Sequence, residues 1–385
     1  MKSSPPVKAL PAVLLALAAP AAAQWLVDPG SDSGRQLSGA FDAQWRRKPD
    51  NPVPCRIGRF PPFLDYGLRV WSGFSLAAPA AALLQGSAPR EIITVIRVTP
   101  LEPKARPAHF YQRLPLPEPP AGADLRKVEM TLGGGWLLGR GKYRVEMLVA
   151  TTAGGECRHA WTVKVQDNSA TLAPGEVGSL DSGYWQGFPN GGRGHAAIFL
   201  HASPVRPRRY VTRLSPWDRQ VLLSTLSAVL RDGGFRSASL VVFELLKREV
   251  IFEQEQVRPE DVGRLARQLA RVDFGTIPIQ TLQSGPLPGD FLLDLVRRSV
   301  RGEPRPDALV FIGARWRGGP KVRFVDPAVR EAAPPSFHLA FSLPNVPEDK
   351  DTMTSLVEGL GGKVYSIYLP RNLAPALRQI REARR

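Results

Sequence analysis

The hydrophobic pattern of this sequence changes near residue 194, and this change limits the chain to a small set of folds. Before that point, apolar and polar residues alternate with a period of two, as in residues 92–98 and 143–149. After it, apolar runs such as 196–200 and 308–312 alternate with stretches in which apolar residues recur every three or four positions. The first pattern predicts strands covered on one face, and the second predicts a parallel sheet with helices on both sides. The 385 residues are enough for two domains.

Residues 24–168 are expected to form an all-β sandwich of antiparallel strands. Several short strands with turn residues between them are typical of this architecture, and Thr152-Ala153-Gly154-Gly155-Glu156 predicts the turn of a hairpin. The segment Gly141-Lys142-Tyr143-Arg144-Val145 is similar to the start of a late strand in an immunoglobulin-like domain. The expected core aromatics are Trp71, Trp136 and Trp161.

Two further segments of the first half carry few apolar repeats. The proline-rich segment 101–123 predicts an irregular loop or an edge strand, because proline cannot donate a backbone hydrogen bond. Residues 169–193 are rich in Gly, Ser, Asp and Asn and are expected to be a linker.

Residues 194–385 are expected to form a three-layer, Rossmann-like α/β domain. Ser215-Pro216 followed by Asp218 predicts a helix start, and Gly233-Gly234 predicts its end. Strands 240–243 and 248–253 are expected to pair as a hairpin.

In its order of elements this second half resembles a von Willebrand factor A-type domain, of the degenerate kind found in exported bacterial proteins after a β domain. The resemblance rests on the strand that ends in Leu200-His201-Ala202-Ser203, the helix after it, the strand pair 240–253, Gly275-Thr276, and the strand 309–313. It implies a site at the carboxyl ends of the parallel strands.

Many such domains hold a divalent cation through D-x-S-x-S, a Thr, and an Asp after a later strand. Here His201 stands in place of the first Asp and Val205 in place of the second Ser, whereas Ser203 and Thr276 match. Gly313-Ala314 supplies no Asp. Hard cations need several oxygen ligands, usually with carboxylates among them, so we expect no metal and no other cofactor, and keep metal-dependent adhesion as an alternative.

The first 23 residues are expected to be a signal peptide. Lys2 and Lys8 precede an apolar run, and Ala21-Ala22-Ala23 predicts the cleavage site. The mature chain is then exported to the bacterial periplasm or secreted, without a membrane span. In an oxidising compartment Cys55 and Cys157 are expected to form a disulfide, with two free thiols as the alternative.

The sequence carries no motif that predicts an enzyme. The five histidines show no metal-ligand spacing, and Cys157 and His159 are expected on opposite faces of a strand. Asp349 and Asp351 lie in a proline-flanked loop and are expected to be solvated. We therefore predict a non-catalytic protein and keep a hydrolase with an unrecognised site as the alternative.

The charge of the chain points to an acidic partner. The net charge is +16, and cleavage after Ala23 leaves +14. Arginines cluster after strand ends, so a basic crevice is expected to bind an acidic protein or cell-surface component. Nucleic acid is not the expected ligand, because no groove-reading motif or aromatic interleaving occurs. The predicted binding residues are Ser203, Arg206, Arg208, Thr276 and Arg315.

Overall fold

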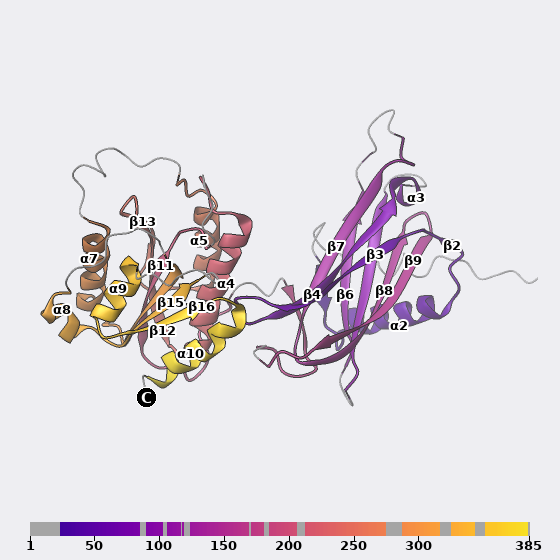
Figure 1. Ribbon diagram of the computed structural model, residues 1–385. Helices are drawn as coiled ribbons and strands as arrows, with labels where there is room; N and C mark the ends of the chain where they lie inside the picture. Colours follow the sequence, from indigo (N-terminus) through magenta and orange to yellow (C-terminus); the bar gives the residue numbers. More distant parts are fainter. Residues whose placement is uncertain are drawn as a thin grey trace, which may run out of the picture. The chain divides into compact units, whose positions relative to one another are not determined.

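The chain has a mixed α/β structure with three sheets (Figure 1). The computed structural model describes residues 24–84, 90–102, 106–116, 118, 124–168, 171–180, 185–205, 212–274, 287–315, 325–342 and 351–383. The contacts divide it into two compact units. Unit 1 is Met1–Leu64 with Arg69–Ser182, and unit 2 is Asp65–Leu68 with Gly183–Arg385. The predicted signal peptide lies outside the described residues.

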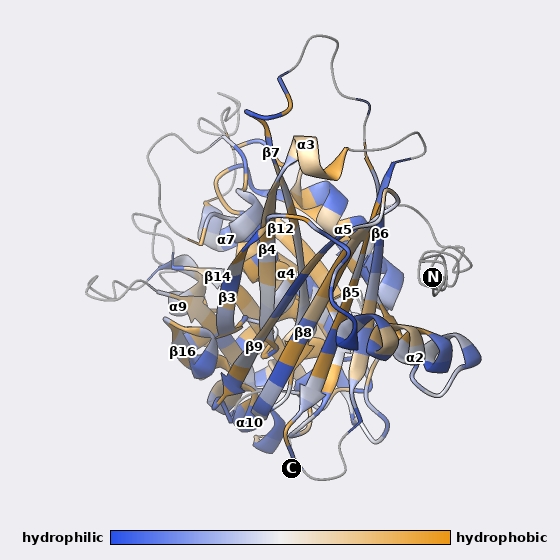
Figure 2. Cartoon of the chain, turned by 90° about the vertical axis from the view of Figure 1, so that its right-hand side faces the viewer, coloured by the Kyte–Doolittle hydropathy of each residue, from blue (hydrophilic) through white to orange (hydrophobic). Residues whose placement is uncertain are grey.

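Unit 1 contains a six-stranded and a four-stranded sheet. The first has the order β1-β6-β5-β8-β9-β2 and the second the order β10-β7-β4-β3. The strands are β1 (Gln24–Val27), β2 (Asn51–Pro52), β3 (Arg56–Leu64), β4 (Val70–Pro79), β5 (Glu91–Pro100), β6 (Ala108–Pro115), β7 (Glu129–Leu138), β8 (Gly141–Thr151), β9 (Gly155–Val165) and β10 (Val177–Ser179). Figure 2 shows hydrophobic and hydrophilic residues alternating along β8 and β9, as the period of two predicts.

One hydrophobic core contains residues of both sheets. Phe74 and Trp136 come from the smaller sheet, and Met147 and Trp161 come from the larger one. The rings of Trp136 and Trp161 lie 6.3 Å apart, so their predicted place in the core is confirmed. The prediction for Trp71 is wrong: this side chain is half-buried, and its indole contacts Phe63 from the neighbouring edge strand.

Unit 1 is not all-β, because helix α2 (Asp32–Arg46) covers part of the larger sheet. The Ser31 hydroxyl accepts a hydrogen bond from the Gly34 N–H and caps the helix start. Leu37 and Phe41, one turn apart, bury their side chains against residues of β5, β6 and β8. A short helix, α3 (Ala80–Leu83), follows β4.

Two segments of unit 1 that were expected to be irregular contain strands. The proline-rich stretch includes β6, which lies between β1 and β5 in the sheet. The expected linker includes β10, which pairs with β7. In both places strand pairing in the folded protein overrides the local loop signals.

Unit 2 is built on one six-stranded sheet with the order β13-β12-β11-β14-β15-β16. Its strands are β11 (His195–His201), β12 (Ser237–Glu244), β13 (Glu249–Gln254), β14 (Ala308–Ala314), β15 (Ser336–Phe341) and β16 (Lys363–Ile367). Strand β13 pairs antiparallel with β12, and the other neighbours are parallel.

Helices lie on both faces of this sheet. They are α4 (Pro216–Asp232), α5 (Pro259–Leu269), α7 (Pro288–Arg301), α8 (Pro327–Ala332), α9 (Thr352–Gly359) and α10 (Leu373–Glu382), with a 3₁₀ turn at Pro370–Asn372. Residues of α7 and α9 share one core with Phe199, Phe243 and Phe311, whose rings lie on one face of the sheet. Helices α4 and α10 contact each other and the sheet strands β14 and β15.

The strand order of unit 2 reverses direction between β11 and β14. Successive strands run outward from β11 to β13 on one side, and from β14 to β16 on the other. The connections after β11 and β14 therefore diverge, and the carboxyl ends of these strands border the crevice in which open α/β sheets bind ligands. No helix in the described part of the chain combines the length and apolar character needed to cross a membrane.

Candidate functional site

His201 lies at the carboxyl end of β11, at the point where the strand order reverses. Its side chain is buried, with an exposed fraction of 1%, and stacks on the Phe243 ring at 5.4 Å. The Leu245 N–H points to Nε2 at 3.5 Å, which leaves the proton on Nδ1, 3.1 Å from the Ser203 hydroxyl oxygen. His201 is thus held as a neutral imidazole between two neighbours.

A second buried histidine, His338, lies on β15. Its Nδ1 is 3.2 Å from the Thr354 hydroxyl, and its buried Nε2 has no hydrogen-bond partner. Burial lowers the pKa of His338 to about 4 and that of His201 to about 4, although Asp351 opposes both shifts. Both rings are therefore neutral at neutral pH.

Asp351 is buried as well, which corrects the prediction that it is solvated. Its carboxylate accepts the Thr354 N–H at 2.6 Å and caps the start of α9. A carboxylate at a helix N-terminus meets unpaired backbone N–H groups, so this position stabilises its charge. Asp349 lies outside the described residues.

Gly313, near the carboxyl end of β14, packs closely against His201. A Cβ at this position would lie 2.8 Å from the Cβ of His201 and 3.0 Å from the Met353 methyl carbon. Only glycine fits there without displacing a neighbour. The space beside His201 is therefore filled by protein side chains.

The predicted binding residues are only partly brought together. Ser203 lies beside His201, with its hydroxyl 3.1 Å from the ring, but it is buried, with an exposed fraction of 8%. Arg315 is half-buried and donates from Nη2 to the Ser366 hydroxyl at 2.9 Å. Arg206, Arg208 and Thr276 lie outside the described residues.

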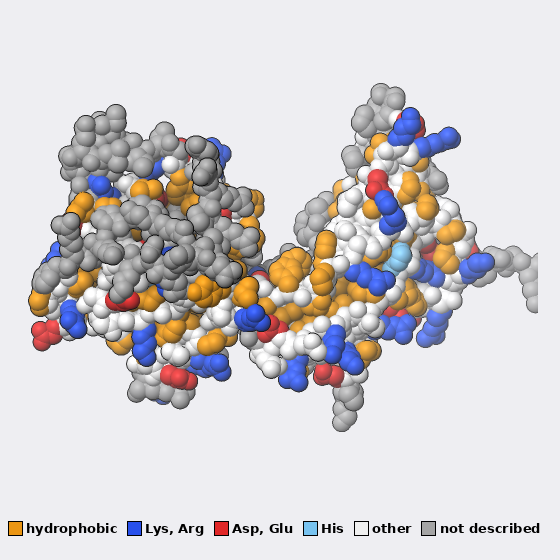
Figure 3. All heavy atoms as spheres, in the orientation of Figure 1, with side chains coloured by type: hydrophobic (Ala, Val, Ile, Leu, Met, Phe, Trp, Pro, Cys, Tyr) orange, Lys and Arg blue, Asp and Glu red, His pale blue; other side chains and the backbone are white. Residues whose placement is uncertain are grey.

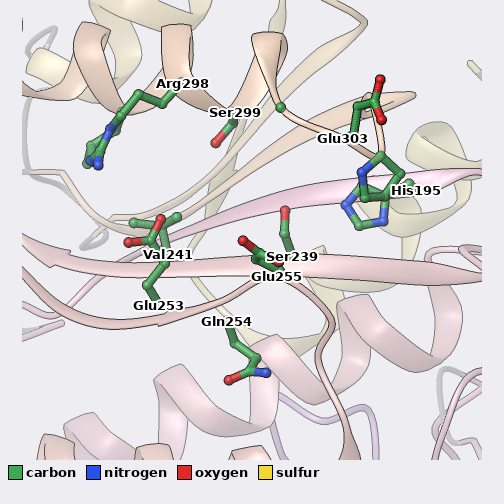
Figure 4. Close-up of a pocket in the computed structure, with 12 residues that line it drawn as sticks. His195, Ser239, Val241, Glu253, Gln254, Glu255, Arg298, Ser299 and Glu303 are labelled. Atoms are coloured by element: carbon green, nitrogen blue, oxygen red, sulfur yellow. The ribbon is translucent and has the colours of Figure 1, made fainter.

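A pocket of about 180 Å³ lies at the opposite edge of the unit 2 sheet, where β11 begins (Figure 4). His195 is buried in its wall, with Nδ1 2.9 Å from the Ser237 hydroxyl. Burial lowers the pKa of His195, and the carboxylate of Asp307 opposes that shift. The other charged residues that line the pocket are Glu253, Glu255, Arg298 and Glu303.

Unit 1 carries a larger groove with basic walls. Its volume is about 770 Å³, and Arg140, Lys142 and Lys164 line it together with Glu102. Lys142 and Lys164 are exposed and directly opposite each other in the β8–β9 register. Like charges placed in this way repel each other. None of these three cations has an ion pair among the described residues.

The sequence held a signal for this groove that we did not use. A hairpin turn at 152–156 aligns residues whose numbers add to about 306, which places position 142 opposite position 164. The Gly-Arg-Gly-Lys run at 139–142 supplies two of the three cations. Pairing the two strands would have placed both lysines together.

Lysine and arginine side chains lie on the visible surface of both units, with acidic side chains beside some of them (Figure 3). No family model matches the sequence, and no curated protein matches it. A crystal structure of a glycosyl hydrolase family 2 (GH2) member from Bacteroides cellulosilyticus DSM 14838 aligns with 82% of this chain and 39% of its own chain, at 10% identity and a TM-score of 0.19. This chain thus spans less than half of that protein. A similarity this weak indicates neither the fold nor the function of this chain.

Proposed function

We propose that this chain is an exported, non-catalytic binding protein for an acidic partner, either an acidic protein or an acidic cell-surface polymer. We further propose that unit 1 is an immunoglobulin-like sandwich and unit 2 a degenerate von Willebrand A-like domain. The reversed strand order and the antiparallel edge pair β12–β13 support the second assignment, and the word degenerate refers to His201 in the place of an aspartate.

The uncompensated cations of the unit 1 groove carry the proposal. Elsewhere in this unit, buried or half-buried arginines have carboxylates beside them: Arg97 contacts Glu146 at 2.7 Å, and Arg113 contacts Glu91 at 2.7 Å. Lys142 and Lys164 have no such partner within the described residues. An acidic ligand placed between them would relieve their repulsion and gain two favourable charge interactions.

The strand-end loops of unit 2 are the second place where an acidic partner is expected to bind. Arg206 and Arg208 follow β11 in the sequence, and Arg315 follows β14. The described part of this edge is filled by His201, Ser203 and Gly313, so contact would be made by the loops and not by a deep cavity.

Binding to an immobilised sulfated polysaccharide, heparin, tests the groove. In the double variant Lys142→Glu/Lys164→Glu we expect at least a tenfold loss of affinity and a weaker dependence on salt. The control is Lys48→Glu/Lys127→Glu, which makes the same change in charge at exposed positions of unit 1 outside the groove. Equal losses in the two double variants would show that only the net charge matters and would contradict the proposal.

A hydrolase remains the second candidate, because the pocket at His195 gathers one imidazole and three carboxylates. Its volume of about 180 Å³ is below the roughly 300 Å³ typical of small-molecule sites. A glycoside or ester substrate that is cleaved by the wild type but not by Glu253→Gln or Glu303→Gln would favour this alternative. Metal-dependent adhesion predicts heat and a raised melting temperature with Mg²⁺ or Ca²⁺.

A further inference from the structure

A disulfide and a histidine lie together at one side of unit 1. Cys55, just before β3, is bonded to Cys157 on β9, which confirms the predicted disulfide. His159 Nε2 lies 3.3 Å from the Cys55 sulfur. The prediction that Cys157 and His159 lie on opposite faces is wrong, because side chains two positions apart in a strand share a face.

These three side chains are a potential ligand set for a metal ion. Both sulfurs and a ring nitrogen of His159 lie within 4.8 Å of one another. No other group of three His, Cys, Asp or Glu side chains in the described residues is close enough together. In the disulfide state the sulfurs are bonded to each other and are not thiolate ligands.

We propose that reduction of the Cys55–Cys157 disulfide by an external dithiol converts this cluster into a zinc site with Cys55, Cys157 and His159 as its protein ligands. The dithiol supplies two electrons and two protons: its two sulfurs join in a new disulfide, the Cys55–Cys157 bond breaks, and two thiols form. Zn²⁺ then displaces both thiol protons, and the His159 lone pair completes the protein ligands. Water occupies the fourth position.

The backbone geometry fits this coordination. Tetrahedral zinc with bonds of about 2.3 Å to sulfur and about 2.05 Å to nitrogen needs S···S and S···N separations of about 3.8 and 3.6 Å. The distance of 3.3 Å between Cys55 and His159 is already close to the second value. The Cα atoms of the cysteines lie 6.4 Å apart, so rotation of the two side chains can separate the sulfurs without moving a strand.

The donor atoms of this cluster determine which ion it would bind. Two thiolates and an imidazole select a soft ion such as zinc over Mg²⁺ or Ca²⁺.

Access to the cluster comes from the Cys55 side. Cys55 and His159 are half-buried, whereas Cys157 is 5% exposed. A dithiol therefore attacks the Cys55 sulfur first, with Cys157 as the leaving thiolate. Because the proposal concerns unit 1 chemistry and not an acidic ligand, it stands or falls independently of the proposed function.

The test is zinc binding by the full chain before and after reduction with a phosphine, read by competition with a chromophoric chelator. We expect one zinc per reduced chain with release of two protons, and none per oxidised chain. Co²⁺ should give a thiolate-to-cobalt charge-transfer band only after reduction. His159→Gln should weaken zinc binding at least tenfold, whereas the matched control His195→Gln in unit 2 should bind as the wild type does.

Three results would overturn the proposal: equal binding by oxidised and reduced chains, wild-type affinity in His159→Gln, or no zinc bound by a reduced chain that keeps its β-sheet circular dichroism. If reduction unfolds unit 1, zinc must restore the dichroism, and failure to do so overturns it as well. The variant Cys55→Ser/Cys157→Ser, checked for folding by the same signal, should bind no zinc with or without the phosphine.

Discussion

The two buried histidines of unit 2 make its stability sensitive to acid, and His338 allows this to be measured. Its pKa is about 4 in the folded protein and about 6.5 in an unfolded chain. As the pH falls, the unfolded state binds the proton first. The stabilisation is therefore complete above pH 6.5 and is lost as the pH falls from 6.5 towards 4.

The expected magnitude follows from these two pKa values. The full difference corresponds to about 3.4 kcal/mol of unfolding free energy, and the loss between pH 7.5 and pH 5 is about 2 kcal/mol for His338. His201 has the same direction of shift and adds a similar loss. His109 in unit 1, also with a pKa of about 4, gives that unit its own acid sensitivity.

Hydrogen exchange resolved by peptide separates the two units. In His338→Asn the side-chain amide takes the place of Nδ1 opposite the Thr354 hydroxyl but does not titrate. The loss of unfolding free energy between pH 7.5 and pH 5, measured on peptides of β11, β14 and β15, should therefore be smaller by about 2 kcal/mol. Peptides of unit 1 serve as the control in the same sample and should keep their wild-type behaviour. If His338→Asn, and His338→Gln as a second variant, keep the whole wild-type loss in unit 2, the reasoning is refuted.

Three further outcomes are expected. Gly313→Ala should lower the unfolding free energy by about 1–3 kcal/mol in urea titrations because its Cβ has no space. Gly39→Ala in α2, where a Cβ would meet nothing within 4 Å beyond its own helix backbone, should raise it by up to about 1 kcal/mol. Asp218→Ala removes the acceptor of the α4 capping box and should cost about 1–2 kcal/mol, seen in the same titrations as a lower midpoint; an unchanged midpoint would contradict this. Reduction of the Cys55–Cys157 disulfide, which spans 102 residues, should destabilise unit 1 by up to about 4.7 kcal/mol in calorimetry and leave the unit 2 transition in place.

Local signals were sufficient for several elements of unit 2. The run 196–200 is the centre of β11, since a strand buried on both faces must be apolar throughout. Ser215 and Asp218, which predict the start of α4, form its capping box, with the Asp218 N–H donating to the Ser215 hydroxyl at 3.1 Å. These features depend on residues close together in the chain, which is why the sequence alone predicts them.

Unit 1 was less predictable because its pattern depends on partners far along the chain. Strand β6 lies among prolines and is recognised only through its pairing with β5 and β1. Helix α2 carried local signals that we did not use, namely the Ser31 cap and the spacing of Leu37 and Phe41. No local pattern places His159 beside Cys55, which is 104 residues away.

The residues around His201, at the carboxyl end of β11, were likewise predictable only in part. The sequence indicated that His201 replaces an aspartate, but not that Gly313 and Met353 close around it. Those contacts depend on side-chain packing between β11, β14 and α9. A short sequence motif does not predict such packing, because the three elements are far apart in the chain.

The close packing of His201 and Met353 around Gly313 also restricts how a cation site could arise at this end of β11, in evolution or by engineering. A lone His201→Asp exchange would place a second carboxylate in the buried space where Asp351 already acts on this position, so the two negative charges would repel each other, and it would leave a void against the Phe243 ring. Each step towards an ion-binding rim is therefore destabilising until several positions have changed together, so a single substitution is not enough to gain the function.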